Sequence, residues 1–322
     1  MEWAQTLYSC AFKTHRFGEK RIVTMPQASL SRHSQLSQVA TWLRLALAGL
    51  LFSMIGGCAS MVVDPLIDPL NHALQRQTDL NLVREGTPTL LLMLDGLIAE
   101  HPDSRKLLLT ATQAYSSYAS TLFELGDVER AAVLSTKARD YGLALLCLTP
   151  SVPGNLHAPL ETFSGCLVSF QKTNVPSLFW AGYGWATWAR LQNGAPAALA
   201  DLPKIEQIML RVIDLDESYY YGAAHIFLGY YYGFRPEMLG GNMEKSRGHF
   251  ERALQIADRK FLLAQVSFAE SYARLTFNRE LFKDLLTEVQ NHSQENDSDL
   301  TTSNQLAKSR ARTLLAQIDD FF

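Results

Sequence analysis

From Asp64 onward, apolar residues of this chain recur every three or four positions, the spacing of one face of an α-helix. Alternating runs of Val, Ile and Thr, which would indicate strands, are almost absent. We therefore predict an all-α fold, a solenoid or bundle of helix pairs with about twelve helices. The expected helices span residues 67–82, 88–100, 104–125, 127–147, 157–171, 176–192, 202–214, 218–233, 243–257, 260–275, 279–290 and 303–319.

Several predicted helices begin at residues whose side chains accept hydrogen bonds from the free amides of the first turn. Asp127, Asp201 and Asn242 are the predicted N-caps. Pro203 would then lie just inside the second of these helices, where proline is tolerated.

Two patterns in the second half resemble the first helix of a tetratricopeptide repeat. Leu228-Gly229-x-x-Tyr232 matches L-G-x-x-Y, and Phe250-x-x-Ala253 belongs to an approximate A-x-x-x-F-x-x-A. Small residues let paired helices approach closely, and the aromatic ring fills the gap beside them. We predict degenerate tetratricopeptide-like helix pairs, with a non-repeating helical bundle as the alternative.

The N-terminal region contains a short apolar run at residues 45–55, preceded by Arg44. The run is shorter than the roughly 18 residues that a membrane-spanning helix needs, but it fits the core of a secretory signal. Ile55-Gly56-Gly57-Cys58 resembles a bacterial lipobox. We predict a signal peptide over residues 1–57 and lipid attachment at Cys58. A short buried helix with an ordinary cysteine is the alternative.

The mature chain would then be a helical domain over residues 58–322. The apolar run follows Met25 at a more usual distance than Met1, so Met25 is a second candidate start. Cleavage removes six Lys or Arg and two Glu, which leaves 23 basic and 30 acidic residues and a net charge of −7. Because Ala59 stands where Asp would favour retention in the inner membrane, we expect a periplasmic protein anchored to the outer membrane.

Composition and motifs argue against catalysis, nucleic-acid binding and metal binding. The isoelectric point of about 6.2 lacks the basic surplus of a nucleic-acid binder. The sequence contains no H-E-x-x-H, G-x-S-x-G, Gly-rich phosphate loop or C-x-x-C. His225, on an aromatic helix, is more simply a hydrogen-bonded core residue, and charged residues of the later helices are interpreted as solvated. We predict a protein that is not an enzyme and holds no cofactor or metal.

Two segments are unusually rich in aromatic residues, Phe179–Trp188 and Tyr219–Tyr232. Successive helical residues are about 100° apart, so three adjacent tyrosines cannot all point inward. Some of these rings would line a groove for a ligand or partner, since an amphipathic ring suits a site with one dry side. Packing between neighbouring helix pairs is the alternative. The candidate groove residues are Trp180, Tyr183, Trp188, Tyr220 and Tyr231.

Cys147 and Cys166 flank a segment with three prolines and would face an oxidising compartment. A disulfide between them would close a loop of about 20 residues and stabilise the fold by roughly 3 kcal/mol. Two buried thiols are the alternative.

Several segments, taken in order, resemble the T component of tripartite ATP-independent periplasmic (TRAP) transporters. The resemblance runs from about Ala99 to the C-terminus, the lipobox agrees with it, and the stretch Cys147–Leu167 departs from it. The segments are Val175–Trp180, Ala200–Lys204, Leu215–His225, Arg235–Gly241 and Ala311–Phe322.

This resemblance implies a lipid-anchored periplasmic protein made of degenerate tetratricopeptide-like repeats. It also implies a homotrimer that docks the transporter's substrate-binding subunit and passes it a small apolar or carboxylate-bearing ligand. The family supplies no catalytic residues to carry over, so we expect a non-enzymatic scaffold. Two other functions stay open: an envelope lipoprotein that binds its own ligand, and a tetratricopeptide-type assembly protein of the envelope.

Overall fold

The computed structural model describes residues 69–70, 72–152, 155–293 and 299–322. The predicted signal peptide and Cys58 lie outside these residues. Two compact units are distinguished, Met1–His72 and Ala73–Phe322. Nearly all described residues belong to the second unit.

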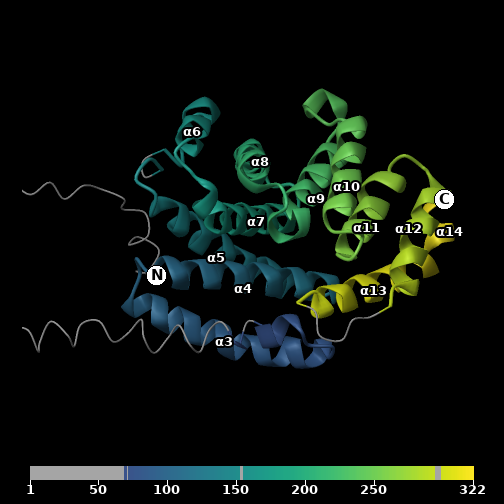
Figure 1. Cartoon of the computed structure of the whole chain (residues 1–322), viewed down its shortest axis with the longest axis horizontal. Helices are drawn as coiled ribbons and strands as arrows, with labels where there is room; N and C mark the ends of the chain where they lie inside the picture. Colours follow the sequence, from purple (N-terminus) through teal and green to yellow (C-terminus); the bar gives the residue numbers. More distant parts are fainter. Residues whose placement is uncertain (1–68, 71, 153–154, 294–298) are drawn as a thin grey trace, which may run out of the picture. The chain divides into compact units, whose positions relative to one another are not determined.

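The second unit is helical, and the described residues contain no strand, which confirms the predicted all-α fold (Figure 1). Three short 3-10 or π segments interrupt the α-helices. The elements are α3 (Leu80–Glu100), α4 (Arg105–Glu124), α5 (Val128–Cys147), α6 (Leu160–Leu167), η1 (Lys172–Asn174), α7 (Val175–Leu191), α8 (Pro196–Asp216), α9 (Tyr219–Phe234), η2 (Glu237–Leu239), α10 (Met243–Ile256), α11 (Leu263–Phe268), η3 (Ala269–Ala273), α12 (Arg279–Asn291), α13 (Thr301–Ala316) and α14 (Ile318–Phe321).

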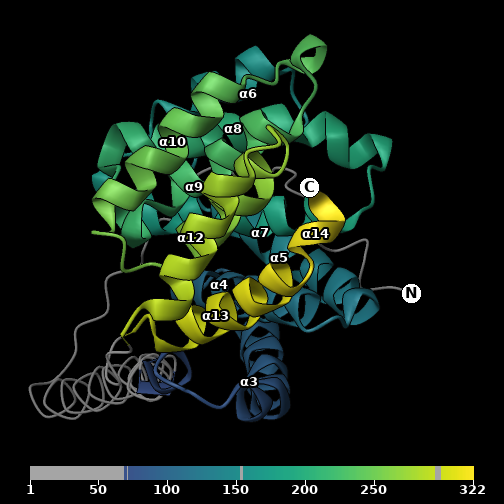
Figure 2. The same ribbon diagram turned by 90° about the vertical axis from the view of Figure 1, so that its right-hand side faces the viewer.

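Most helices pack on their neighbours along the chain, as α4 does on α5, α7 on α8, α9 on α10 and α12 on α13, and α5 packs on α7 across the short α6. This sequential packing agrees with the predicted stacking of helix pairs. In addition, α13 contacts α3 and α4 (Figure 2). The Thr302 hydroxyl donates to the carbonyl oxygens of Leu74 and Gln77, at 2.6 and 2.7 Å. The last long helix is therefore tied to the beginning of the same unit.

Glycines allow α5 and α7 to pack closely. A Cβ atom on Gly184 would lie 2.9 Å from the Ala138 carbonyl oxygen, and one on Gly142 would lie 3.0 Å from the Ala181 Cα. The first distance is shorter than a Cβ atom tolerates, so Gly184 requires glycine, and the second is so tight that a larger residue at Gly142 would displace its neighbour. The largest buried cluster extends from this interface through α7, α8 and α9.

The predicted division between helices 67–82 and 88–100 is wrong. One helix, α3, begins after Asp79, whose side chain accepts from the amides of Asn81 and Leu82. Pro88 lies inside α3 and cannot donate to the Arg84 carbonyl. The Tyr118 hydroxyl of α4 donates to that carbonyl instead, at 2.6 Å, which lets the helix continue.

Three other predicted boundaries need correction. α8 begins at Pro196, so Asp201 is not its N-cap; the Asp201 carboxylate accepts from the Trp185 indole at 2.9 Å. The predicted helix 157–171 is shortened to α6, and 260–275 is divided between α11 and η3. The prediction for Asn242 is confirmed, since its side chain accepts from the Lys245 amide at 2.8 Å. Asp127 occupies the N-cap position of α5 without forming a side-chain cap bond.

Candidate functional site

Charged side chains from four elements meet where α13 returns to α4. Glu124 ends α4, Arg190 lies on α7, Glu270 on η3 and Arg310 on α13. The nearest nitrogen and oxygen atoms are 3.8 Å apart for Arg190 and Glu124, and 3.6 Å for Arg310 and Glu124. Arg310 Nε also donates to Glu270 at 3.1 Å. These four residues are called the ion network below.

The ion network is only partly open to water, because each of its side chains is between 18% and 34% exposed. Burial raises the pKa of Glu124, and Glu270 adds to that shift, while Arg190 and Arg310 oppose it. Burial also raises the pKa of the neighbouring Tyr230. The carboxylates are thus stabilised by two guanidinium groups that come from distant parts of the chain.

The ion network has no arrangement suited to bond cleavage. It holds no nucleophile beside a base, and the Arg190 guanidinium stacks on the Phe123 ring at 4.4 Å. No group of three or more His, Cys, Asp or Glu within the described residues is placed to bind a metal ion. The arrangement joins α4, α7, η3 and α13 electrostatically.

The predicted aromatic groove is wrong for three of its five residues. Trp180, Trp188 and Tyr231 are buried in the core, with exposed fractions of 3%, 8% and 4%. The polar atoms of two of them find partners inside the protein: the Trp180 indole donates to the Tyr219 hydroxyl, and the Tyr231 hydroxyl donates to Glu206. Because these polar edges are satisfied internally, the rings do not need a wet side.

Tyr183 and Tyr220 are half-buried. The Tyr183 hydroxyl lies 3.2 Å from the Ser120 hydroxyl of α4. The Tyr220 ring packs edge-on against Trp180, with centroids 4.8 Å apart. The alternative interpretation, packing between neighbouring helices, therefore describes the aromatic set better than an open groove.

A histidine pair joins α9 to α10. The Nδ1 atoms of His225 and His249 are 2.9 Å apart, so one imidazole donates to the other. His225 is buried, as predicted for a core histidine, and its Nε2 lies 3.5 Å from Glu217. Burial lowers the pKa of His225, and burial together with His225 and Lys245 lowers the pKa of His249 to about 4. Protonation of either ring is thus disfavoured in the folded protein.

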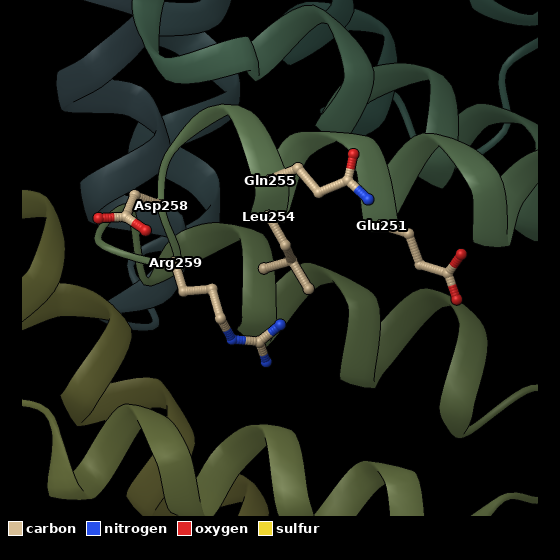
Figure 3. A pocket seen from close by; sticks show the side chains of 5 residues that line it. All are labelled: Glu251, Leu254, Gln255, Asp258 and Arg259. Atoms are coloured by element: carbon tan, nitrogen blue, oxygen red, sulfur yellow. The ribbon is translucent and has the colours of Figure 1, made fainter.

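A shallow depression of about 360 Å³ lies beside the end of α10. Figure 3 shows that its side chains do not converge: Arg259 extends beneath Leu254, Asp258 points another way, and Glu251 stands at the far edge. The Arg259 guanidinium is already paired with Glu288. The depression therefore has no free charged group aimed at a ligand.

The predicted disulfide is not formed, since no bond joins the sulfur atoms of Cys147 and Cys166. The Cys166 thiol donates to the Thr162 carbonyl within α6. The Ser151 hydroxyl bonds to the Cys166 carbonyl and to the Ser169 hydroxyl, at 3.3 and 2.7 Å. Hydrogen bonds thus fasten this loop to α6 in place of a covalent bridge.

Sequence reasoning missed the ion network because it interpreted charges on the later helices as solvated. One signal was available: Glu270 is the only charged residue in the segment Phe261–Ala273. A lone carboxylate in an apolar run is seldom fully solvated. Its partner Arg310 carries no comparable signal.

Among the described residues, no helix combines the length and the apolar character needed to cross a membrane.

A relative from Treponema pallidum (strain Nichols), an uncharacterised protein, is 27% identical over 267 residues, which cover 76% of this chain and 81% of the relative. The family model for the TRAP transporter T-component matches residues 76–322. This match confirms the resemblance of the sequence segments. With about three quarters of its length matched, the chain belongs to the TRAP transporter T-component family.

Proposed function

We propose that this TRAP transporter-associated envelope protein is a non-enzymatic scaffold that docks the transporter's substrate-binding subunit. Family membership over residues 76–322 is the observation that carries the proposal. Stacked helices support it, because they offer extended binding surfaces without needing catalytic chemistry. The ion network is consistent with this role, since it ties distant helices together and contains no reactive constellation.

A lipid anchor at Cys58 would hold the scaffold at the periplasmic face of the outer membrane. Anchoring confines both partners to a thin layer and so raises their effective concentration. Mass spectrometry of the mature N-terminus tests this part: we expect a Cys58 that carries acyl chains. An unmodified Cys58, or a chain that retains residues 1–57, would contradict the anchor.

Docking is proposed to use an apolar surface at the end of α9. Phe234, Met238 and Phe277 are 62%, 88% and 78% exposed, and large apolar side chains left open to water are candidates for an interaction site. Phe234 and Met238 lie at and just after the end of α9, and Phe277 follows η3, which packs on α9. Phe277 also has a positive φ of 53°, an unfavourable conformation for a residue with a Cβ atom. We call these three residues the α9-end surface.

Pull-down from envelope extracts after mild crosslinking tests docking. We expect the full chain to recover a TRAP-type substrate-binding protein, and a Met238→Ser/Phe277→Ser variant to recover much less. Val133→Ser is the matched control, since Val133 is 70% exposed on α5, away from the α9-end surface. Recovery of no periplasmic binding protein by the unaltered chain would count against the proposal.

The same proposal includes a homotrimer and the transfer of a small apolar or carboxylate-bearing ligand to the docked subunit. Sedimentation equilibrium of the mature chain tests the trimer: we expect a mass three times that of one chain. A single-chain mass at all concentrations would remove the trimer and leave docking to be decided by the pull-down.

A further inference from the structure

Three consecutive residues at the start of α9 have a left-handed backbone. The φ angles of Tyr220, Tyr221 and Gly222 are 48°, 58° and 73°. Glycine adopts this conformation readily, but a Cβ atom clashes with the following carbonyl oxygen, so such residues occur singly. Two adjacent tyrosines in this region therefore require stabilisation from their surroundings, and such strain clusters at functional positions.

The surroundings of Tyr220 are aromatic. Its ring centroid lies 4.8 Å from that of Trp180, 5.7 Å from Phe179, 6.0 Å from Phe261 and 6.5 Å from Tyr219. These four surrounding rings are called the ring box below. They come from α7, the start of α9 and the segment before α11, so Tyr220 fills a space where separate parts of the core meet.

The hydroxyl of Tyr220 differs from those of its neighbours. The Tyr219 hydroxyl accepts from the Trp180 indole at 3.2 Å, and the Tyr183 hydroxyl lies 3.2 Å from Ser120. The Tyr220 hydroxyl forms no hydrogen bond with any residue that the structure describes, and burial raises its pKa. The ring of Tyr220 is thus well packed, while its hydroxyl has no partner among the described residues and remains accessible to solvent.

Gly222 is suited to act as the hinge of this segment. It adopts left- and right-handed conformations with similar ease. Its closest neighbour is the Ile256 side chain, 3.1 Å from where a Cβ atom would be. A right-handed conformation of Tyr220–Gly222 would extend the regular part of α9 toward its N-terminus and withdraw the Tyr220 ring from the ring box.

We propose that the ring box is a binding site for a small planar aromatic molecule, and that Tyr220 occupies it when no such molecule is bound. Exchange of one ring for another leaves the buried apolar area nearly unchanged. The exchange also releases the left-handed strain of two tyrosines. The neighbouring Tyr221 is 37% exposed, so the site lies directly beneath the surface. This proposal does not depend on docking to a substrate-binding subunit.

Calorimetric titration of the full chain with p-cresol, which reproduces the tyrosine ring, tests the site. Tyr220→Ala removes the internal occupant, so we expect it to bind p-cresol at least tenfold more tightly than the unaltered chain. Cyclohexanol is the control ligand, because it is of similar size but not planar, and we expect it to bind at least tenfold more weakly. A folded Tyr220→Ala variant that does not bind p-cresol would overturn the site.

A matched pair at Tyr221 tests the hinge, because both variants lose the same packing of the Tyr221 ring on Phe261 and differ only in backbone preference. Tyr221→Ala and Tyr221→Gly both remove the same ring, but only glycine is comfortable at positive φ. Glycine therefore favours the closed segment, and we expect Tyr221→Ala to bind p-cresol about fivefold more tightly than Tyr221→Gly. Thermal melts confirm that both variants fold. Equal affinities for p-cresol would overturn the role of the left-handed segment.

Discussion

The α4–α5–α7 layer and the region of α9, α10 and η3 are both buried helical packing, but they are stabilised in different ways. Glycines allow helices to approach closely in both regions. In the first region, hydroxyls such as those of Thr112 and Ser116 return to carbonyls of their own helix. The second region contains left-handed tyrosines, a π-helix and a histidine pair. The left-handed tyrosines and the histidine pair thus lie in one part of the protein, where we expect function rather than packing to have selected them.

The largest expected effect tests whether close packing dominates the first region. Gly184→Ala would place a Cβ atom 2.9 Å from the Ala138 carbonyl oxygen and 3.1 Å from the Ser116 hydroxyl, and the Ala138 backbone leaves little room for adjustment. We expect the free energy of unfolding to fall by about 2 kcal/mol, as measured by urea denaturation.

The matched control is Gly248→Ala. Gly248 lies within α10 with no atom near its expected Cβ position. This substitution should stabilise the protein by about 0.5–1 kcal/mol, because alanine loses less backbone entropy in a helix. If Gly184→Ala behaved like this control, close packing at Gly184 would not contribute to the stability of the first region.

The second prediction concerns the ion network. Arg310→Met removes a guanidinium shared by Glu124 and Glu270 and leaves two partly buried carboxylates near each other. We expect the free energy of unfolding to fall by about 1–2 kcal/mol. This loss is smaller than that for a fully buried pair, because the groups are up to about a third exposed and water screens their charges.

Arg247→Met is the control for Arg310→Met, since Arg247 pairs with Glu251 on an exposed helix face. We expect no measurable change in its denaturation midpoint. Equal effects of the two variants would show that the ion network is no more than a solvated surface pair.

The third prediction is a pH dependence that arises in the second region. The folded-state pKa values of His225 and His249 lie below the ordinary value of about 6.5. Protonation therefore favours the unfolded chain. The stability due to the neutral pair is fully present above pH 6.5 and is lost as the pH falls from 6.5 toward about 4.

Denaturation midpoints measured across this pH range check the assignment. His249→Phe keeps a ring against Tyr232 but cannot be protonated, so we expect a shallower loss of stability. Substitution of the exposed His101 by glutamine should leave the curve unchanged. A curve for His249→Phe that overlays that of the unaltered chain would remove the histidine pair as the cause.

The smallest expected effect concerns the loop between α5 and α6. Because hydrogen bonds of Ser151 hold it and no disulfide is formed, dithiothreitol should leave the melting temperature unchanged. A clear decrease would show that Cys147 and Cys166 are bridged in solution.

How much the sequence could predict depends on whether the partners of a residue lie near it along the chain or come from another helix. Helical periodicity and the Asn242 cap depend on neighbours along the chain, and both predictions are confirmed. The break assigned near Pro88 is wrong because Tyr118, thirty-four positions from Arg84, satisfies the carbonyl that Pro88 leaves free. Such a partner is known only once α3 and α4 are packed together.

The candidate site was harder to predict for a related reason. Aromatic segments were recognised, but whether a ring faces water depends on partners such as Glu206 for Tyr231, which come from another helix. The ion network joins Glu124 to Arg310, and only the return of α13 to α4 brings them together. The left-handed backbone at Tyr220 and Tyr221 has no sequence signal apart from the glycine that follows.

Docking of a substrate-binding subunit is the central claim, and calorimetric titration of the purified mature chain with that subunit tests it most directly. We predict saturable binding that is lost in the Met238→Ser/Phe277→Ser variant and retained in Val133→Ser. The claim would be contradicted if the unaltered, folded chain gave no binding heat and formed no complex at concentrations where both proteins are soluble.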